Sequence, residues 1–180
     1  MRNWLVGGAL IARGDGLLLV SNRRRNDSLD WSPPGGVIDE GETVLEGLAR
    51  EVREETGLTV CSVERCAYRV EVAAPGLGWV LRVEAWEVSV EGDISLDDPD
   101  GIVEQCRYTS AGEARRLVAT SPLWITVPVG SWLDRRQAAA AAGRLLAPDA
   151  SAPGDAADAP LFRFRLHGTD RRTAIAEHLG

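Results

Sequence analysis

One segment, residues 44–56, has such clear boundaries that it constrains the fold of the whole chain. Thr43 followed by Glu46 has the spacing of a capping box, in which each side chain accepts a hydrogen bond from the backbone of the other residue at the start of a helix. Gly57 stands where a helix favours a residue with left-handed backbone angles. The pattern therefore predicts a helix over residues 44–56.

Strand-like segments stand on both sides of this helix. Residues 3–13 and 16–22 are apolar and flank a Gly-Asp-Gly turn at 14–16. After the helix, residues 59–73 and 79–91 alternate in part around the turn sequence "APGLG", which indicates a second hairpin. Because hairpins dominate on both sides of a helix, we predict an α+β chain, an α/β/α sandwich with a mixed sheet and not a purely parallel one.

Further elements follow in chain order. Residues 23–36 are rich in turn formers and indicate a loop. A short strand is expected near 102–109, the start of a helix within 110–119, and a stronger helix over the alanine-rich residues 131–146. The order of elements therefore places most of the regular structure before residue 146.

A segment of low complexity divides the chain. Residues 146–160 are mostly alanine, proline, glycine and aspartate, a composition that cannot bury a core, so we predict a flexible linker. It would separate a main domain over residues 1–145 from an extension over 161–180. The extension begins with a cleanly alternating strand, "LFRFRLHG", and residues 169–179 fit a short helix. A strand after a tether suggests a docking element, for which a homodimer is one hypothesis.

Charge and residue usage disfavour several classes of function. The formal charge of −7 repels long polyanions, which disfavours general binding of nucleic-acid polymers. The chain has no lysine, which removes a phosphate-loop lysine and a Schiff-base lysine. With only two histidines, a histidine-based triad is poorly supported. We therefore expect any chemistry to depend on carboxylates.

The cysteine pattern and the N-terminal sequence both bear on the cellular compartment. Three cysteines without a C-x-x-C motif argue against both a disulfide framework and a zinc site, so we expect reduced thiols in a cytoplasm. The apolar run at the N-terminus breaks at Arg13 and indicates a strand, not a signal peptide or a membrane span.

Three glutamates crowd one face of the helix predicted at 44–56. Glu51, Glu54 and Glu55 follow the spacings i, i+3 and i+4, at which like charges destabilise a helix by roughly 0.2–0.5 kcal/mol per pair. The ordinary interpretation is a solvated outer face. A hard divalent cation such as Mg²⁺ would instead relieve the repulsion, since it prefers oxygen ligands. Gly47 falls in the same sector and would leave room for a group to approach.

The residues around this helix resemble a known motif. Gly36 is followed after five residues by Glu42, and after seven more by Arg50 and the run "REVREETGL". Residues 36–58 thereby resemble the complete box of the Nudix hydrolase family, and the lead-in "WSPPGGVIDEGE" is similar to the family's usual approach to it. The resemblance extends to about residue 145 and implies the family's α/β/α sandwich.

The resemblance implies a reaction and a set of roles. The reaction is hydrolysis of a nucleoside diphosphate linked to another group, with Mg²⁺ or Mn²⁺ bound at the box. Arg50 would orient the glutamates, and Glu42 would hold the loop ahead of the helix. The resemblance implies that Glu51, Glu54 and Glu55 bind the metal or act as the general base, with the Gly36 carbonyl as a further ligand.

The position of a further acidic ligand or base stays open. Many members of the family take one from a segment about 40 residues beyond the box. Glu104 is our favoured candidate. It competes with Asp97, Asp98 and Asp100.

Substrate contacts are expected from the loop before the box. The run Arg23, Arg24 and Arg25 would bring positive charge to a polyphosphate, or would form a solvated face. Trp31 would stack on a base or pack in the core.

Several functions remain in competition. The favoured one is a metal-dependent pyrophosphohydrolase acting on a nucleoside triphosphate or another nucleotide derivative. The first alternative is an ADP-ribose or nucleotide-sugar pyrophosphatase. The others are a non-catalytic nucleotide sensor of the same fold and an acidic interaction module.

Overall fold

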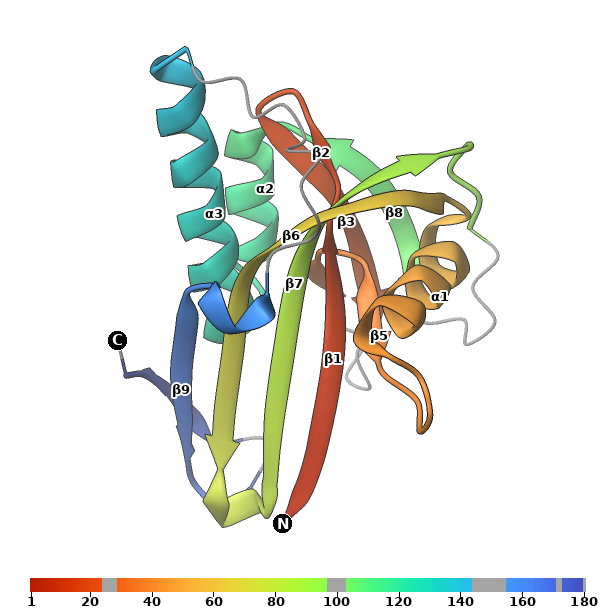
Figure 1. Cartoon of the computed structure of the whole chain (residues 1–180). Helices are drawn as coiled ribbons and strands as arrows, with labels where there is room; N and C mark the ends of the chain where they lie inside the picture. Colours follow the sequence, from red (N-terminus) through yellow and green to blue (C-terminus); the bar gives the residue numbers. More distant parts are fainter. Residues whose placement is uncertain (24–28, 97–102, 144–154, 171–172, 180) are drawn as a thin grey trace.

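A computed structural model describes residues 1–23, 29–96, 103–143, 155–170 and 173–179 (Figure 1). Its α-helices are α1 (Val44–Thr56), α2 (Ala111–Val118) and α3 (Leu123–Ala141). The strands before α1 are β1 (Arg2–Leu10), β2 (Ala12–Arg13), β3 (Gly16–Arg23), β4 (Leu29–Ser32) and β5 (Gly35–Val37). The later strands are β6 (Thr59–Ala74), β7 (Trp79–Glu91), β8 (Val103–Thr109), β9 (Leu161–His167) and β10 (Ile175–His178). Two short 3₁₀ turns are η1 (Pro75–Leu77) and η2 (Ala156–Asp158).

The strands form two sheets. The larger has the order β10-β9-β6-β7-β1-β5, and the smaller joins β2, β3 and β4, with β8 paired to β3. Within the larger sheet, β1 lies parallel to β7 and β6 lies parallel to β9, while the remaining pairs are antiparallel. The sheet is therefore mixed, as the sequence predicts.

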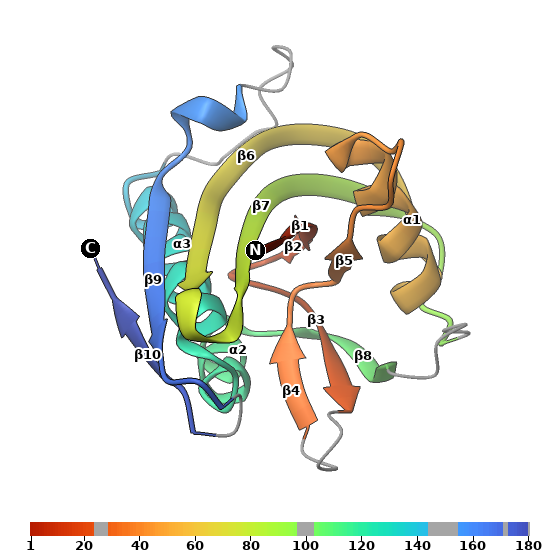
Figure 2. The same ribbon diagram turned by 90° about the horizontal axis from the view of Figure 1, so that it is seen from below.

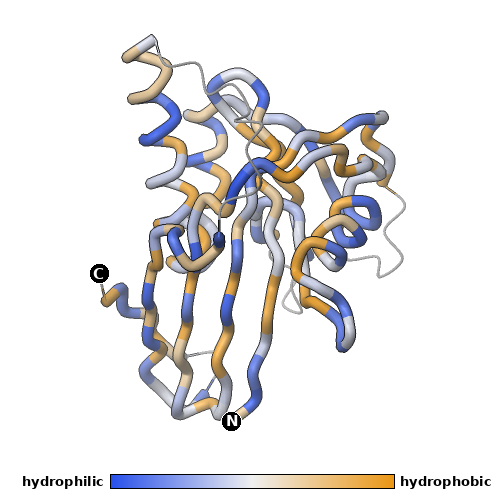
Figure 3. The backbone as a smooth tube through the Cα atoms, viewed as in Figure 1, coloured by the Kyte–Doolittle hydropathy of each residue, from blue (hydrophilic) through white to orange (hydrophobic). Residues whose placement is uncertain are grey.

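Two apolar cores lie on opposite faces of the strands. Leu48 and Val52 of α1 pack in one core with Leu18, whereas the neighbouring Leu17 packs in the other core. The second core also contains Trp132 of α3. Seen from below, α1 lies on one side of the strands and the pair α2 and α3 on the other (Figure 2). Hydrophobic and hydrophilic residues alternate along the long strands (Figure 3), and the layers form the predicted α/β/α sandwich.

Helix α1 and both predicted hairpins are confirmed. The Thr43 and Glu46 side chains form the complete capping box, and Gly57 ends α1 with a φ of 75°. Strands β2 and β3 pair across the turn at 14–16. Strands β6 and β7 pair along their length around η1.

Three sequence predictions of local structure are wrong. Strands β4 and β5 lie within the expected loop at 23–36, where Trp31 pairs with Ser21 and the β5 glycines pair with β1. Helix α3 begins at Leu123, ahead of the expected 131, although it contains Pro128. Burial of its apolar side chains against the sheet outweighs the poor helix propensity of this segment.

The third error concerns the end of the chain. Residues 169–179 contain β10 in place of a helix, because pairing with β9 satisfies the backbone of β10. Strand β9 is confirmed and lies parallel to β6 of the same chain, with Phe164 opposite Val72. The Phe164 side chain is buried in the core shared with α3, so β9 is an integral strand of the main sheet.

Among the helices of the described residues, none is long and apolar enough to cross a bilayer.

Candidate active site

Helix α1 is held close to the sheet by a small residue on β1. A side-chain carbon at Gly7 would lie 3.2–3.4 Å from Ile38, from Leu48 and from the backbone of Val44. The buried side of α1 is apolar, with Leu48 and Val52 almost completely covered. The acidic side of the helix is consequently turned away from the core and toward the loop that precedes it.

Two glycines of β5 contact carboxylates of α1. A Cβ atom at Gly36 would lie 2.4 Å from the Glu51 carboxylate, so only glycine lets these groups meet. The Gly35 N–H donates a hydrogen bond of 2.8 Å to Glu55 Oε2. The backbone of β5 therefore forms one wall of the acidic site.

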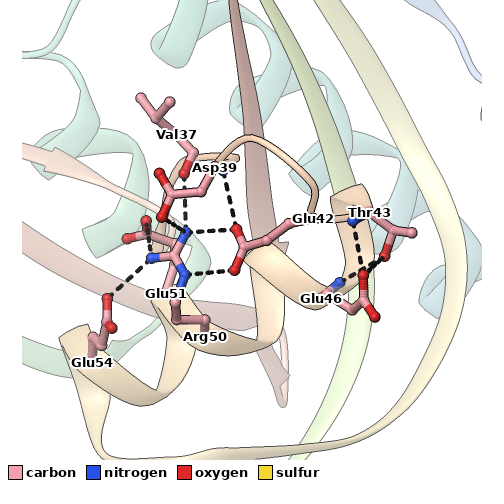
Figure 4. A network of polar contacts seen from close by, with 8 residues as sticks. All are labelled: Val37, Asp39, Glu42, Thr43, Glu46, Arg50, Glu51 and Glu54. Carbon is pink, nitrogen blue, oxygen red and sulfur yellow. Dashed lines mark hydrogen bonds and ion pairs between the residues drawn. The ribbon is translucent and has the colours of Figure 1, made fainter.

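Arg50 connects the acidic side chains to one another (Figure 4). Its guanidinium bonds both oxygens of Glu42 at 2.9 Å, Glu51 at 2.8 Å and Glu54 at 3.2 Å. It also donates to the Val37 carbonyl at 3.1 Å. Arg50 thus reaches Glu54, as the sequence analysis expects, and in addition fixes the leading loop.

The pKa values reflect this network. The hydrogen bonds from Arg50, and then the one from the Asp39 backbone N–H, lower the pKa of Glu42 to about 2. The pKa of Arg50 is raised above its ordinary value, mainly by the hydrogen bonds to Glu42. Glu42 is therefore an anion over the whole physiological range, in an arrangement that suits the loop-holding role predicted for it.

The space expected beside Gly47 is occupied by the protein itself. A Cβ atom at Gly47 would lie 2.7 Å from Ile38 and 2.8 Å from the Glu42 carboxylate. The glycine therefore leaves room for a group to approach, as expected, and the approaching groups belong to the leading loop of the protein itself.

The side-chain oxygens on the acidic face of α1 are of a type that binds divalent cations. Carboxylate oxygens of Glu51, Glu54 and Glu55 are hard ligands of the kind that Mg²⁺ and Mn²⁺ prefer. The absence of a side chain at Gly36 lets the Glu51 carboxylate lie directly against the backbone of β5. Over the described part of the chain, no three acidic, histidine or cysteine side chains converge as a ligand cluster. Arg50 bonds both Glu51 and Glu54.

Glu104 lies on β8 and forms an ion pair with Arg23 at the end of β3. It shares a face of β8 with Cys106, two residues along. Burial, and then the nearby charge of Glu55, raise the pKa of the Cys106 thiol to about 12. Glu104 therefore belongs to the strand face that approaches α1.

The structure leaves some predicted residues undescribed. The candidates Arg24, Arg25, Asp97, Asp98 and Asp100 lie outside the described residues.

Trp31 is 7% exposed and packs in the core on the α2 and α3 side. Its backbone N–H donates to Ser121 Oγ at 2.9 Å, and its carbonyl accepts from the same hydroxyl at 2.7 Å. This burial supports the packing role for Trp31 over stacking on a base.

Two residues of the site are not among the candidates predicted from the sequence. Gly35 positions Glu55 through its N–H, and Asp39 lies 3.6 Å from Arg50 while its own N–H holds Glu42. The pair of adjacent glycines in the lead-in is the signal for Gly35. Asp39 carries no such signal, because its contribution to Glu42 is a backbone N–H.

Comparisons with known proteins agree with this architecture. The family model of the NUDIX domain matches residues 2–126. An 8-oxo-(d)GTP phosphatase of Mycolicibacterium smegmatis is 32% identical over 114 residues, which cover 58% of this chain and 34% of that protein. A MutT-like protein of Streptomyces ambofaciens is 49% identical over 51 residues, which cover 28% of this chain and 32% of that protein. The chain thus spans about a third of the length of these curated relatives.

A solved structure shares the fold. The NUDIX hydrolase from Nitrosomonas europaea aligns with a TM-score of 0.63 and 20% identity, over 77% of this chain and 90% of that one. At this identity the likeness concerns the fold alone. The family model, however, covers most of the chain and includes the helix that carries Glu51, Glu54 and Glu55. The chain belongs to the Nudix family.

Proposed function

We propose that this protein is a divalent-metal-dependent pyrophosphohydrolase that cleaves a nucleoside diphosphate linked to another moiety. The observation that carries the proposal is the acidic face of α1 in a chain of the Nudix family. All three carboxylates are present: Arg50 bonds Glu51 and Glu54, and the Gly35 N–H of β5 bonds Glu55.

The ligands of the metal are proposed from this arrangement. Glu51, Glu54 and Glu55 would hold Mg²⁺ or Mn²⁺, with the Gly36 carbonyl as a further ligand. When bound, the cation would supply positive charge to the phosphoryl oxygens and lower the pKa of a water molecule. Arg50 already neutralises part of the acidic charge and would keep Glu51 and Glu54 oriented for the ion.

The proton acceptor is the next role to assign. The Glu54 side chain is 39% exposed, compared with 16% for Glu51, so a water molecule can reach its oxygens more easily. The Glu104 carboxylate forms an ion pair with Arg23. We therefore assign proton acceptance from water to Glu54, and a supporting role on β8 to Glu104 and Arg23.

The substrate class is proposed from charge and from the relatives. A nucleoside triphosphate or a nucleotide derivative is compatible with a chain of charge −7 because the sequence has a run of three cations, Arg23, Arg24 and Arg25, ahead of the box. Relatives of the chain bear the names 8-oxo-(d)GTP phosphatase, 8-oxo-dGDP phosphatase and RNA pyrophosphohydrolase. Their names guide the choice of test substrates.

The decisive experiment replaces Glu54 with Gln. Phosphate or pyrophosphate release is measured with Mg²⁺ and with Mn²⁺ against nucleoside triphosphates, oxidised nucleotides, dinucleoside polyphosphates, ADP-ribose and nucleotide sugars. Glu54→Gln is expected to lower the rate on the best substrate by about ten-fold or more, because a charged group at the reacting centre is lost.

A matched control separates chemistry from general loss of charge. Glu64→Gln removes a carboxylate that bonds Ser89 on the sheet, and it should leave the rate unchanged. Equal rates for the parent protein and Glu54→Gln would refute the assignment. Stabilisation by nucleotides without any turnover would instead identify a sensor.

A further inference from the structure

A cavity of about 440 Å³ lies on the α3 side of the sheet, where β6, β7, α3 and residues 155–160 meet. No residue of the Nudix box lines it. Its volume falls within the range typical of small-molecule sites, about 300–1,000 Å³. Figure 1 shows η2 beside α3 and β6, away from α1.

The inner wall of this cavity is a buried polar network. The Glu87 side chain is only 6% exposed and accepts hydrogen bonds from Arg65 at 2.9 and 3.1 Å. The Trp132 indole N–H donates to the same carboxylate at 2.7 Å. Glu87 and Arg65 therefore neutralise each other, and the network fixes the position of α3 on β7.

Two further guanidinium groups line the cavity, opposite the acidic residues Asp155 and Asp158. Arg135 bonds Ser131 Oγ and the Ala67 carbonyl, and Arg136 bonds the Gly14 carbonyl. Within the described residues neither forms an ion pair, and the Arg136 Nε is buried with no hydrogen-bond partner. Arg136 also lies over the Trp132 ring, 5.1 Å from its centroid, which limits its freedom to turn away. Helix α3 thus presents two cations to the cavity.

The opposite wall comes from the C-terminal part of the chain. The Arg69 guanidinium donates to the Ala157 carbonyl at 2.8 Å and the Ala159 carbonyl at 3.3 Å, which fastens η2 to β6. This wall carries Asp155 and Asp158, whose oxygens can accept hydrogen bonds from hydroxyl or amino groups. The cavity is therefore cationic on one side and hydrogen-bond accepting on the other.

We propose that this cavity is a second ligand site, for a small phosphate monoester that also carries hydroxyl or amino groups. A phosphate monoester has a charge of about −1.5 to −2 at neutral pH, which matches two unpaired guanidinium groups better than a single carboxylate does. Guanidinium groups bind phosphate through paired hydrogen bonds, and the Arg135 and Arg136 side chains both line the cavity. Residues 155–160 thereby have a role, since they complete the site.

The test uses the full chain labelled with ¹⁵N, in EDTA, with Glu54→Gln in place. These conditions remove metal and turnover, so the outcome does not depend on the proposed hydrolysis. The Trp132 indole resonance, assigned with Trp132→Phe, reports on the cavity because this N–H bonds Glu87. Ribose 5-phosphate and inorganic phosphate should shift the resonance saturably, whereas ribose and acetate should not.

Matched variants locate the binding groups. Arg136→Met and Arg135→Met should each lower the affinity for ribose 5-phosphate by about ten-fold or more, the loss expected for a hydrogen bond to a charged group. Arg136→Lys should restore part of the affinity, since it keeps the charge. Arg163→Met, which removes an exposed guanidinium from β9, should change nothing. Unchanged melting temperatures establish that the variants fold.

Three results would overturn the proposal. The first is a Trp132 resonance that stays in place at millimolar ribose 5-phosphate. The second is equal affinity in the parent and in a folded Arg136→Met protein. The third is an equal response to acetate, which would exclude selectivity for phosphate.

Discussion

Arg50 is the residue on which the candidate site is centred, because its guanidinium bonds Glu42 on the leading loop as well as Glu51 and Glu54 on the helix. The loop and the helix therefore share one cation. Loss of any single carboxylate would leave Arg50 with other partners, whereas loss of Arg50 would leave several carboxylates close together without compensation.

The low pKa of Glu42 leads to a pH-dependent stability. Arg50 lowers this pKa from 4.5 to about 2, so the stabilisation is fully present above pH 4.5 and is lost as the pH falls toward 2. The melting temperature of Glu42→Gln should therefore lie below that of the parent at neutral pH. The gap should narrow as the pH is lowered through this window. A gap that stays constant down to pH 2 would contradict the ion pair.

The contact between Gly36 and Glu51 is tested by adding one methyl group. Gly36→Ala would place a carbon 2.4 Å from the Glu51 carboxylate and force this carboxylate to move. We expect activity to fall by about ten-fold or more, since small displacements at a reacting centre are costly. Gly8→Ala is the control on the paired strand β1, because its new carbon would lie 4.0 Å from the nearest atoms. Similar activities for the two variants would contradict the role of Gly36.

Single residues differ in how far the sequence alone defines them. Glu51, Glu54 and Glu55 could be placed on one face from their spacing, since a helix has a fixed period. The groups that fill the space beside Gly47 could not be predicted, because Ile38 and Glu42 reach this space from a loop whose path depends on tertiary contacts. Spacing predicts which side chains point together, but it does not predict which neighbours meet them.

Among the elements, α1 presents the acidic groups, and its position depends on its N-terminal cap. Thr43 Oγ1 accepts from the Glu46 N–H at 3.3 Å, and the Glu46 carboxylate accepts from the Thr43 N–H at 2.8 Å. Thr43→Ala should lower the free energy of unfolding by about 1 kcal/mol, the usual loss for a helix cap. Thr43→Ser keeps the hydroxyl and is expected to retain most of the stability. Urea unfolding of both variants measures the difference, and equal losses would argue against the cap.

The elements also show why some boundaries are predictable. Helix α1 has local signals at both ends, so its limits were predicted correctly. Helix α3 has Pro128 inside it and no side-chain cap at its start, and burial of Val129, Trp132 and Leu133 stabilises it. Strand β10 depends on β9, a partner that no local pattern identifies. Elements stabilised by tertiary contacts are the ones that the sequence predicts poorly.

For the molecule as a whole, the C-terminal strands decide whether the chain unfolds as one unit. Phe164 is 1% exposed and lies in the core with α3 and β6. Phe164→Ala should cost about 3–5 kcal/mol of unfolding free energy, the range for truncating a buried phenylalanine. Arg163→Ala, on the exposed side of β9, should change stability by no more than about 0.5 kcal/mol.

The same denaturation experiment distinguishes one unit from two. If β9 and β10 belong to the main core, fluorescence and circular dichroism should report a single coincident transition. A separate early transition in the parent protein, moved only by Phe164→Ala, would indicate an independent C-terminal module.

The parallel pairing of β9 with β6 has a consequence for biosynthesis. β6 leaves the ribosome about 90 residues before its outer neighbour does, since Arg69 pairs with Leu161. During that interval the outer backbone of β6 is an uncovered edge, which nascent chains on neighbouring ribosomes can join. Translation speed and chaperone supply should therefore affect the yield of native protein.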